Sequence, residues 1–451
     1  RLVLDTPYPD WDVRWSPEGS WLLVIADTEG SDQGIFIVPA SGGEVIQLSD
    51  ENGPLSAKQG RWSPDGKRIA FASNSRGFYD IGIYTLATGE INWVTQGYGD
   101  KISPSWSPDG KRLVYIYNAD GVTHLAVHSL GEPTPETYQV EPGLHLLPQF
   151  SPRGEALVFI FNNPRCPDDL WHLTLSDANF RQLTSSLPPD LQEAAFVMPS
   201  VERIPGLDGV PVPALLFQPP PAKDLPPAVV LVHGGPNWHL DVMWYPLVQH
   251  MTSRGWVVIA PNYRGSTGYG REWQYASRFD QGGVDTRDVV ATAQYLSQQG
   301  LADPKRIAVT GTSHGGYLTM MALTQYPQVW AAGSAVVPFL NWFTSHANSR
   351  DDLQHWDIEN LGDPEKDYDL WYERSPFFFL DRVNASVQLI CGANDVRCPA
   401  SESIAARDAL EALGKPVDFH LYPDEGHGFL KTENVIDAAR RRVQFLARAL
   451  E

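Results

Sequence analysis

The chain has 451 residues, of which 42% are hydrophobic, and its formal net charge at pH 7 is −20. That is enough apolar material for two hydrophobic cores, and no apolar run is long enough to cross a membrane. The negative charge argues against nucleic acid or an anionic membrane as a partner, because both would repel the chain.

A short motif recurs along the N-terminal part of the chain. An aromatic residue, Ser-Pro, one further residue and Gly stand at residues 15–19, 62–66, 106–110 and 150–154, at intervals of 47, 44 and 44 residues. This period matches one four-stranded blade of a β-propeller. Proline cannot donate in a strand ladder and glycine accepts a positive φ, so each motif predicts a tight turn between two strands. The motifs predict four blades, and we expect a fifth around residues 170–197.

A domain boundary is expected near Pro199. It separates a propeller domain of residues 1–199 from a second domain of residues 200–451. After the boundary come a hairpin-like segment and a proline-rich stretch. The sheet of the second domain is expected to begin at Ala228, where the apolar sequence AVVLV indicates a buried strand.

A glycine-containing turn follows this strand, with the sequence HGGP at residues 233–236. Glycine lets the backbone approach a substrate, so the turn is expected to supply a backbone N–H donor to an oxyanion. Gly235 is the first choice for this donor and Gly234 the second. Further along, Arg264 is a candidate for binding a substrate carbonyl or carboxylate, with a structural ion pair as the alternative.

Residues 311–315 have the sequence GTSHG, a G-x-S-x-G frame centred on Ser313. The residues before it predict a buried strand, and the residues after it predict a helix. Strand, tight turn and helix form the setting in which this frame exposes a nucleophilic serine. The helix N-terminus favours negative charge, so the backbone N–H of His314 is expected to be the other oxyanion donor.

Two further polar residues follow predicted strands. Asp395 comes after an apolar run that ends in a glycine-containing loop, and His427 lies in the loop after the strand at residues 417–421. Active sites collect at the carboxyl edge of an open parallel sheet. The order Ser, Asp, His is that of the α/β-hydrolase triad. We therefore predict Ser313 as nucleophile, His427 as base and Asp395 as the residue that orients the imidazole.

The loop around Asp395 contains other candidates. Arg397 is a second candidate for binding a substrate carbonyl or carboxylate, again with a structural ion pair as the alternative. Cys391 and Cys398 flank Asp395, and Cys166 is the third cysteine of the chain. Three cysteines make no disulfide framework, so we expect buried free thiols and a cytoplasmic protein, with a local disulfide as the alternative.

These motifs resemble those of the prolyl oligopeptidase family of serine peptidases, and within it the acylaminoacyl peptidase branch. The matching stretches are residues 232–236, 261–270, 311–315, 394–399 and 423–428. The resemblance implies an α/β-hydrolase domain with a doubly wound, mostly parallel sheet, preceded by an all-β propeller. It also implies action on short peptides, with no metal and no other cofactor.

The chain departs from the family pattern at three points. His233 stands where prolyl- and dipeptidyl-cleaving relatives place a Tyr whose hydroxyl binds the oxyanion. In this respect the chain resembles the acylaminoacyl branch, in which two backbone N–H groups bind the oxyanion. His314 occupies a position often held by Tyr, although its backbone role does not depend on the side chain. The family propeller usually has seven or eight blades, and this chain, which begins at Arg1, shows four to five. Either N-terminal blades are missing from the sequence or the propeller is unusually small.

We therefore expect a serine peptidase that cleaves short peptides through an acyl-enzyme and releases N-acylated amino acids from blocked peptides. A dipeptidyl peptidase or oligopeptidase of the same family and a carboxylesterase remain alternatives, because one triad serves several substrates. A propeller binding module with a degenerate hydrolase partner is a third alternative, which the complete triad disfavours. The expected partners are short peptides, with no nucleic acid and no membrane, and homo-oligomerisation is left open.

Overall fold

The computed structural model describes residues 10–28, 32–192 and 194–451. The chain divides into two compact units. The first unit holds the described residues up to Ala194 together with two short later segments, Asp241–Trp244 and Gly268–Glu272. The second unit holds the rest of the chain from Ala195 onward.

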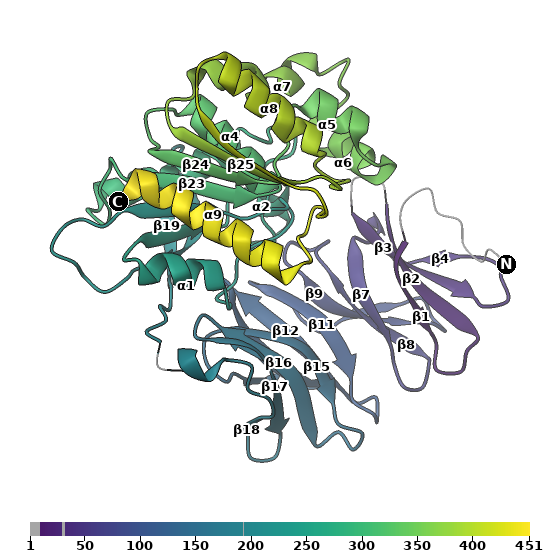
Figure 1. The fold of residues 1–451 in the computed structure, drawn as a ribbon. Helices are drawn as coiled ribbons and strands as arrows, with labels where there is room; N and C mark the ends of the chain where they lie inside the picture. Colours follow the sequence, from purple (N-terminus) through teal and green to yellow (C-terminus); the bar gives the residue numbers. More distant parts are fainter. Residues whose placement is uncertain (1–9, 29–31, 193) are drawn as a thin grey trace. The chain divides into compact units, whose positions relative to one another are not determined.

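The first unit consists of antiparallel four-stranded sheets arranged as β-propeller blades (Figure 1). Within each blade the strands pair in the order in which they occur along the chain. The four blades contain β1 (Asp10–Trp15), β2 (Trp21–Asp27), β3 (Gln33–Pro39) and β4 (Ile46–Gln47); β7 (Ala57–Trp62), β8 (Arg68–Ser73), β9 (Asp80–Thr85) and β10 (Ile91–Trp93); β11 (Asp100–Trp106), β12 (Arg112–Ala119), β13 (Val122–Ser129) and β14 (Glu136–Tyr138); β15 (Leu144–Phe150), β16 (Ala156–Asn163), β17 (Cys166–Thr174) and β18 (Asn179–Gln182). A small hairpin of β5 (Ser49–Asp50) and β6 (Gly53–Pro54) follows the first blade.

The prediction of a fifth blade around residues 170–197 is wrong. Leu170 lies in β17, and β17 and β18 complete the fourth blade. Among the described residues after β18, the chain forms only a short 3-10 helix, Pro189–Leu191, before the sheet of the second unit begins. The sequence correctly predicted strands in this segment, but these strands belong to the fourth blade.

The repeated motif joins neighbouring blades as well as neighbouring strands. In the third blade, Trp106 Nε1 donates a hydrogen bond of 3.0 Å to the carbonyl oxygen of Arg61 in the preceding blade. The Arg112 guanidinium donates in the other direction, to the carbonyl oxygen of Gly154 in the following blade, at 2.5 Å. Each such bond links a side chain of one blade to a backbone carbonyl oxygen of its neighbour.

Trp106→Ala is expected to destabilise the first unit far more than Trp15→Ala. The two residues occupy the same place in the motif, but Trp106 is 8% exposed and Trp15 is 63% exposed. Removing the buried indole leaves a cavity and should cost about 3 kcal/mol or more, whereas an exposed substitution should stay within about 0.5 kcal/mol. Denaturant unfolding of both variants measures the difference. Equal losses of stability would contradict this account of the motif.

The second unit is built on one eight-stranded sheet with the order β19-β20-β22-β21-β23-β24-β25-β26. The pairs β19–β20 and β20–β22 are antiparallel, and the strands from β22 to β26 along this order are parallel. The strands are β19 (Ser200–Pro205), β20 (Pro211–Phe217), β21 (Ala228–Val232), β22 (Val257–Pro261), β23 (Ile307–Thr312), β24 (Ala332–Val336), β25 (Ser386–Gly392) and β26 (Val417–Tyr422).

The expectation that this sheet begins at Ala228 is wrong, because β19 and β20 precede that residue in the same sheet. The two strands form the hairpin that the sequence suggested, but the hairpin extends the sheet instead of standing before it. Prolines stand at the facing ends of the two strands, Pro205 and Pro211. Pro205 lies on the edge strand β19, and Pro211 precedes the residues of β20 that pair with β22, so neither proline faces a third strand.

Helices cover both faces of the sheet, as a doubly wound fold requires. Helix α4 packs on β23 and β24 beside α3, and α9 crosses the near face of the sheet in Figure 1. The helices are α1 (Pro246–Ser253), α2 (Arg271–Tyr275), α3 (Val284–Gln298), α4 (His314–Gln325), α5 (Trp342–Asn348), α6 (Asp351–Leu361), α7 (Tyr368–Glu373), α8 (Ala400–Ala412) and α9 (Thr432–Leu450). The core between sheet and helices is apolar and fully buried, with Val230, Val309, Leu318 and Met320 among its members.

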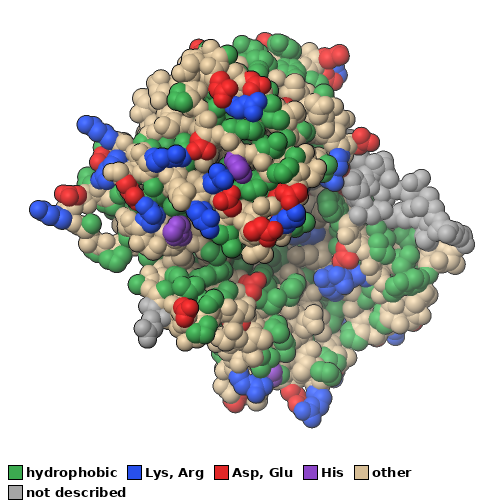
Figure 2. Space-filling model, viewed as in Figure 1, with side chains coloured by type: hydrophobic (Ala, Val, Ile, Leu, Met, Phe, Trp, Pro, Cys, Tyr) green, Lys and Arg blue, Asp and Glu red, His purple; other side chains and the backbone are tan. Residues whose placement is uncertain are grey.

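Acidic and basic side chains are mixed over the face of the molecule drawn in Figure 2. The net charge of −20 is therefore not gathered there into a single acidic patch. None of the helices among the described residues combines the length and the apolar character needed to span a membrane.

Candidate active site

Ser313 lies in the sharp turn between β23 and α4, with φ 61° and ψ −125°. This left-handed backbone conformation is strained for a residue with a side chain. A Cβ added to Gly311 would lie 2.7 Å from the Val232 carbonyl oxygen, and one added to Gly315 would lie 2.6 Å from the His233 carbonyl oxygen. Both glycines of the G-x-S-x-G frame are therefore required by close backbone approach.

The three residues of the predicted triad lie in one hydrogen-bonded chain. The Ser313 Oγ atom is 2.9 Å from His427 Nε2, and His427 Nδ1 is 2.9 Å from Asp395 Oδ2. A carboxylate can only accept, so Nδ1 carries the proton and Nε2 is free to accept from the serine hydroxyl. This geometry would allow His427 to accept the Ser313 proton while Asp395 orients the imidazole.

The local fold positions the acid and the base together. Asp395 follows β25 and His427 follows β26, and the Asn394 N–H donates a hydrogen bond of 2.9 Å to the Glu425 carbonyl oxygen, which joins the two loops. The Asp395 side chain is fully buried. Its second oxygen accepts the backbone N–H groups of Arg397 and of the next residue at 2.8 and 2.9 Å. These bonds hold the carboxylate in one orientation toward the imidazole.

The residues predicted as oxyanion donors border the nucleophile. A Cβ added to Gly234 would lie 3.4 Å from the Cβ of Ser313, so the backbone of this loop runs directly beside the serine. Gly235 has φ +126°, a conformation that glycine adopts easily. His314 is the first residue of α4, so its N–H has no acceptor within the helix. The roles of these N–H groups in binding an oxyanion remain a prediction.

The His233 side chain supports the oxyanion loop from inside. Its Nδ1 lies 2.7 Å from the Gly234 carbonyl oxygen, its Nε2 lies 2.8 Å from Ser266 Oγ, and its ring stacks on Tyr263 at 4.2 Å. A carbonyl oxygen can only accept, so Nδ1 donates to Gly234. The Ser266 hydroxyl donates its single proton to the Tyr263 carbonyl oxygen at 2.6 Å, so that proton is not available to Nε2. Burial lowers the pKa of His233 from its ordinary value of 6.5 to about 3. The imidazole is therefore neutral at physiological pH and holds the loop through its Nδ1–H bond.

The lowered pKa of His233 predicts a specific pH dependence of stability. Between about pH 6.5 and pH 3, the unfolded chain binds a proton at this residue that the folded chain does not. The free energy of unfolding should therefore fall as pH falls through this window, by up to about 1.4 kcal/mol per pH unit from this residue. His233→Asn should unfold with a correspondingly shallower pH dependence. Urea unfolding at several pH values tests this, and parallel pH profiles for the two proteins would refute it.

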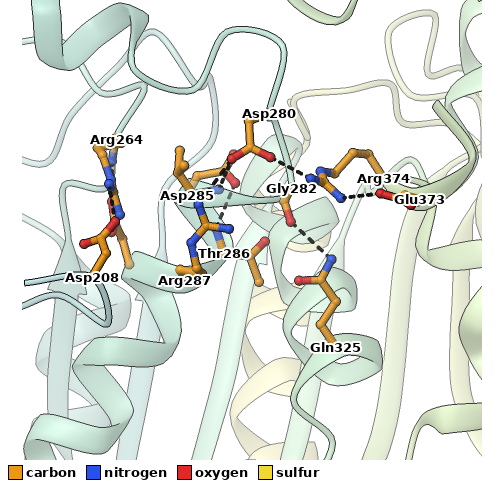
Figure 3. Close-up of polar contacts among 12 residues, drawn as sticks. Asp208, Arg264, Asp280, Gly282, Asp285, Thr286, Arg287, Gln325, Glu373 and Arg374 are labelled. Carbon is orange, nitrogen blue, oxygen red and sulfur yellow. Dashed lines mark hydrogen bonds and ion pairs between the residues drawn. The ribbon is translucent and has the colours of Figure 1, made fainter. Parts of the chain in front are cut away.

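Arg264 forms ion pairs with two carboxylates, which favours the structural alternative over substrate binding. Its Nη2 and Nε atoms contact Asp288 at 2.6 and 3.0 Å, and its Nη1 contacts Asp208 at 2.6 Å (Figure 3). The guanidinium is nearly buried between these two carboxylates, so it forms the structural ion pair that was the alternative. Arg397, by contrast, has an exposed side chain, and its role in substrate binding stays a prediction.

Two buried carboxylates near the site were not predicted from the sequence. Asp285 Oδ2 lies 3.4 Å from His314 Nε2, and both side chains are buried. Glu402 accepts the backbone N–H groups of Leu340 and Asn341 at 3.2 and 3.0 Å, ahead of α5. Both acids stand in the first turn of a helix, where acidic residues are common because they complement the helix dipole. No local pattern distinguished these two from ordinary first-turn acids.

Comparison with known proteins gives a consistent result. Residues 243–451 match the family model of the prolyl oligopeptidase family. Dipeptidyl peptidase family member 6 of Caenorhabditis elegans is 35% identical over 229 residues, which cover 49% of this chain and 31% of that protein. The acylamino-acid-releasing enzyme of Rattus norvegicus is 31% identical over 243 residues, which cover 52% of this chain and 33% of that protein. The match therefore spans about a third of the length of these curated relatives.

The fold of the whole described chain also occurs among solved structures. A puromycin-hydrolyzing peptidase of Mycobacterium tuberculosis superposes with a TM-score of 0.91 at 25% sequence identity. The superposition covers 100% of this chain and 71% of that one. An acylaminoacyl peptidase of Pyrococcus horikoshii, 23% identical with a TM-score of 0.77, has the same fold.

Proposed function

Since the chain belongs, through its C-terminal domain, to the prolyl oligopeptidase family of serine peptidases, we propose that it hydrolyses short peptides through an acyl-enzyme on Ser313. One observation carries this proposal, the chain of two 2.9 Å hydrogen bonds that joins Ser313, His427 and Asp395. A serine hydroxyl is a weak nucleophile without such a base. A strained elbow and a buried, oriented carboxylate are what this chemistry requires.

In the proposed acylation step, Ser313 Oγ attacks the carbonyl carbon of the scissile bond and its proton passes to His427 Nε2. Asp395 accepts the Nδ1–H bond throughout and stabilises the imidazolium that forms. The carbonyl oxygen becomes an oxyanion, and the backbone N–H groups of His314 and Gly235 are the proposed donors to it, with Gly234 as the second choice for the latter. Collapse of the tetrahedral intermediate releases the amine, which takes the proton from His427.

In the proposed deacylation step, water replaces the amine. His427 Nε2 accepts a proton from water, and the resulting oxygen nucleophile attacks the acyl carbon bound to Ser313. The same two N–H donors bind the second oxyanion. The acid product leaves when Ser313 Oγ takes the proton back from His427, which restores the hydrogen bond that the structure contains.

Ser313→Ala is expected to lower kcat by about 10⁴-fold or more with the fold intact, because the covalent route is lost. Hydrolysis of a peptide p-nitroanilide measures the rate. Ser253→Ala is the matched control, because Ser253 is an exposed serine whose hydroxyl donates to the His250 carbonyl oxygen of its own helix. A fluorophosphonate should label the wild type and the control but not Ser313→Ala. Full activity in a pure Ser313→Ala protein would refute the assignment of the nucleophile.

We further propose that the preferred peptides have a blocked N-terminus. A free ammonium that leaves water needs a carboxylate partner, or it binds poorly. The carboxylates around the catalytic loops are already engaged: Asp395 with His427, Asp288 with Arg264, and Glu402 with backbone N–H groups. An acylated N-terminus has no charge and does not need such a partner. The name of the Rattus norvegicus relative, an acylamino-acid-releasing enzyme, agrees with this proposal.

Acetyl-Ala-p-nitroanilide is therefore expected to be hydrolysed with a higher kcat/KM than Ala-p-nitroanilide or the free-amine Ala-Ala-p-nitroanilide. The three substrates share one leaving group, so differences in kcat/KM report recognition of the N-terminus. A clear preference for the free-amine dipeptide would move the assignment to a dipeptidyl peptidase, the activity in the name of the Caenorhabditis elegans relative. Faster turnover of a matched p-nitrophenyl ester with no peptide cleavage would favour a carboxylesterase.

We also propose a cytoplasmic location, which the state of the cysteines supports. Cys166, Cys391 and Cys398 are all free, so the local disulfide considered for the loop around Asp395 is not formed. Burial raises the pKa of Cys391 to about 11 and raises the pKa of Cys398 as well. Both thiols are therefore protonated at neutral pH and resist oxidation, as expected of structural cysteines.

A further inference from the structure

The acids at the start of α3 have different partners. Asp280 accepts from Arg374 at 2.7 Å and lies 3.3 Å from Arg287 (Figure 3). Asp288, eight residues further along the chain, is paired with Arg264. Each of these two carboxylates therefore faces at least one guanidinium, which balances its charge. Asp285 lies between them in the sequence and has a different kind of partner.

Among the described residues, His314 is the one basic side chain within ion-pair distance of Asp285, with Nε2 3.4 Å from Oδ2. The other carboxylate oxygen accepts the Thr286 backbone N–H at 2.8 Å. The Asp285 side chain is 0% exposed and that of His314 is 2% exposed. A buried carboxylate without a donor is strongly unfavourable. A carboxylate oxygen can only accept, so His314 Nε2 carries the hydrogen that faces Asp285 Oδ2.

This contact acts on the residue that follows the nucleophile. The peptide bond between Ser313 and His314 carries the N–H proposed as an oxyanion donor. On its N-terminal side stands the strained φ of 61° at Ser313. Such strain costs about 1–3 kcal/mol and persists only where the surroundings hold the backbone in place. The Asp285 bond is a directional restraint on His314, whereas the rings of Tyr263, Tyr317 and Phe339 contact it without a polar bond.

We propose that Asp285 is a positioning residue: by accepting the His314 Nε2–H bond, it holds the backbone N–H of His314 in the oxyanion hole. The inference rests on the proposed function, because it concerns the same hydrolytic step. It adds a second His–Asp pair to the site, with a different task from that of His427 and Asp395. The first pair moves a proton, and the second pair fixes the direction of a hydrogen-bond donor.

The test uses variants that separate positioning from simple charge balance. His314→Gln can place an amide N–H near the position of Nε2, so it retains the bond to Asp285. His314→Phe combined with Asp285→Leu removes the bond and also removes the buried charge, while it keeps most of the side-chain volume. Asp280→Asn is the matched control, since it weakens ion pairs at the start of α3 without touching His314. Thermal unfolding of every variant establishes that it is folded.

Three quantities are measured for each variant: kcat and KM for acetyl-Ala-p-nitroanilide, and Ki for an acetyl-aminoacyl boronic acid. Boron accepts a lone pair from Ser313 Oγ and forms a tetrahedral adduct whose affinity depends on the oxyanion donors. The double variant should lower kcat about 10-fold or more and raise the boronate Ki by a similar factor, with KM changed less than about threefold. His314→Gln should lower kcat and raise the boronate Ki less than the double variant does, because it keeps a donor to Asp285. Asp280→Asn should keep all three quantities within about threefold of the wild type.

Each other outcome overturns the proposal. A folded double variant with unchanged kcat and boronate Ki would show that the pair only balances charge. A change in KM alone would make His314 part of the substrate-binding wall. Failure of the volume-matched double variant to fold would assign the pair to stability. Fluorophosphonate labelling of the wild type is measured first, because lack of labelling at Ser313 would contradict the proposed function itself and is distinguishable from these results.

Discussion

The site depends on the close approach of two backbone segments, the elbow after β23 and the end of β21. Neither Gly311 nor Gly315 leaves room for a Cβ, because carbonyl oxygens of Val232 and His233 occupy that space. This contact places the nucleophile beside the loop that contains Gly234 and Gly235. The spacing between the serine and the proposed oxyanion donors is therefore set by main-chain atoms. Side chains around the site hold that spacing, but they do not create it.

Buried charge is the second constraint on this architecture. An uncompensated charge in the interior is strongly unfavourable, so every buried carboxylate near the site must have donors. Asp288 has a guanidinium, Glu402 has backbone N–H groups, and Asp395 has both backbone N–H groups and an imidazole. Only the last of these sets includes a group that can exchange a proton with a substrate. Asp285 also has an imidazole partner in His314, so what distinguishes Asp395 is that its imidazole reaches the Ser313 hydroxyl.

Local sequence was sufficient for features that lie within a few residues of one another. The elbow around Ser313 and the two loops with Asp395 and His427 follow strands whose ends are visible as apolar runs, so their meeting at one sheet edge could be predicted. The directions in which side chains point could not be predicted from the sequence. Arg264 stands in a loop at the same edge, yet its guanidinium turns inward to Asp288 and Asp208, which lie 24 and 56 residues away in the sequence. The partner of a side chain depends on packing between distant segments.

The same limit explains the errors in the architecture. The strand that contains Leu170 was visible, but its membership in the fourth blade depends on pairing with β16, which periodicity alone does not reveal. The hairpin of β19 and β20 was visible, but its place in the sheet depends on pairing with β22, about forty residues further on. The pair formed by Asp285 and His314 lies beyond prediction for the same reason, since the residues come from different helices.

The hydrogen bond between Asn394 and Glu425 has a consequence for how this protein would lose activity. This hydrogen bond joins the loop of Asp395 to the loop of His427, so a local opening that leaves it intact moves both residues away from Ser313 together. Molecules in which Ser313 and His427 remain in contact while Asp395 is displaced should then be rare. During inactivation, the fraction of active molecules would then fall, while kcat per active molecule would stay unchanged.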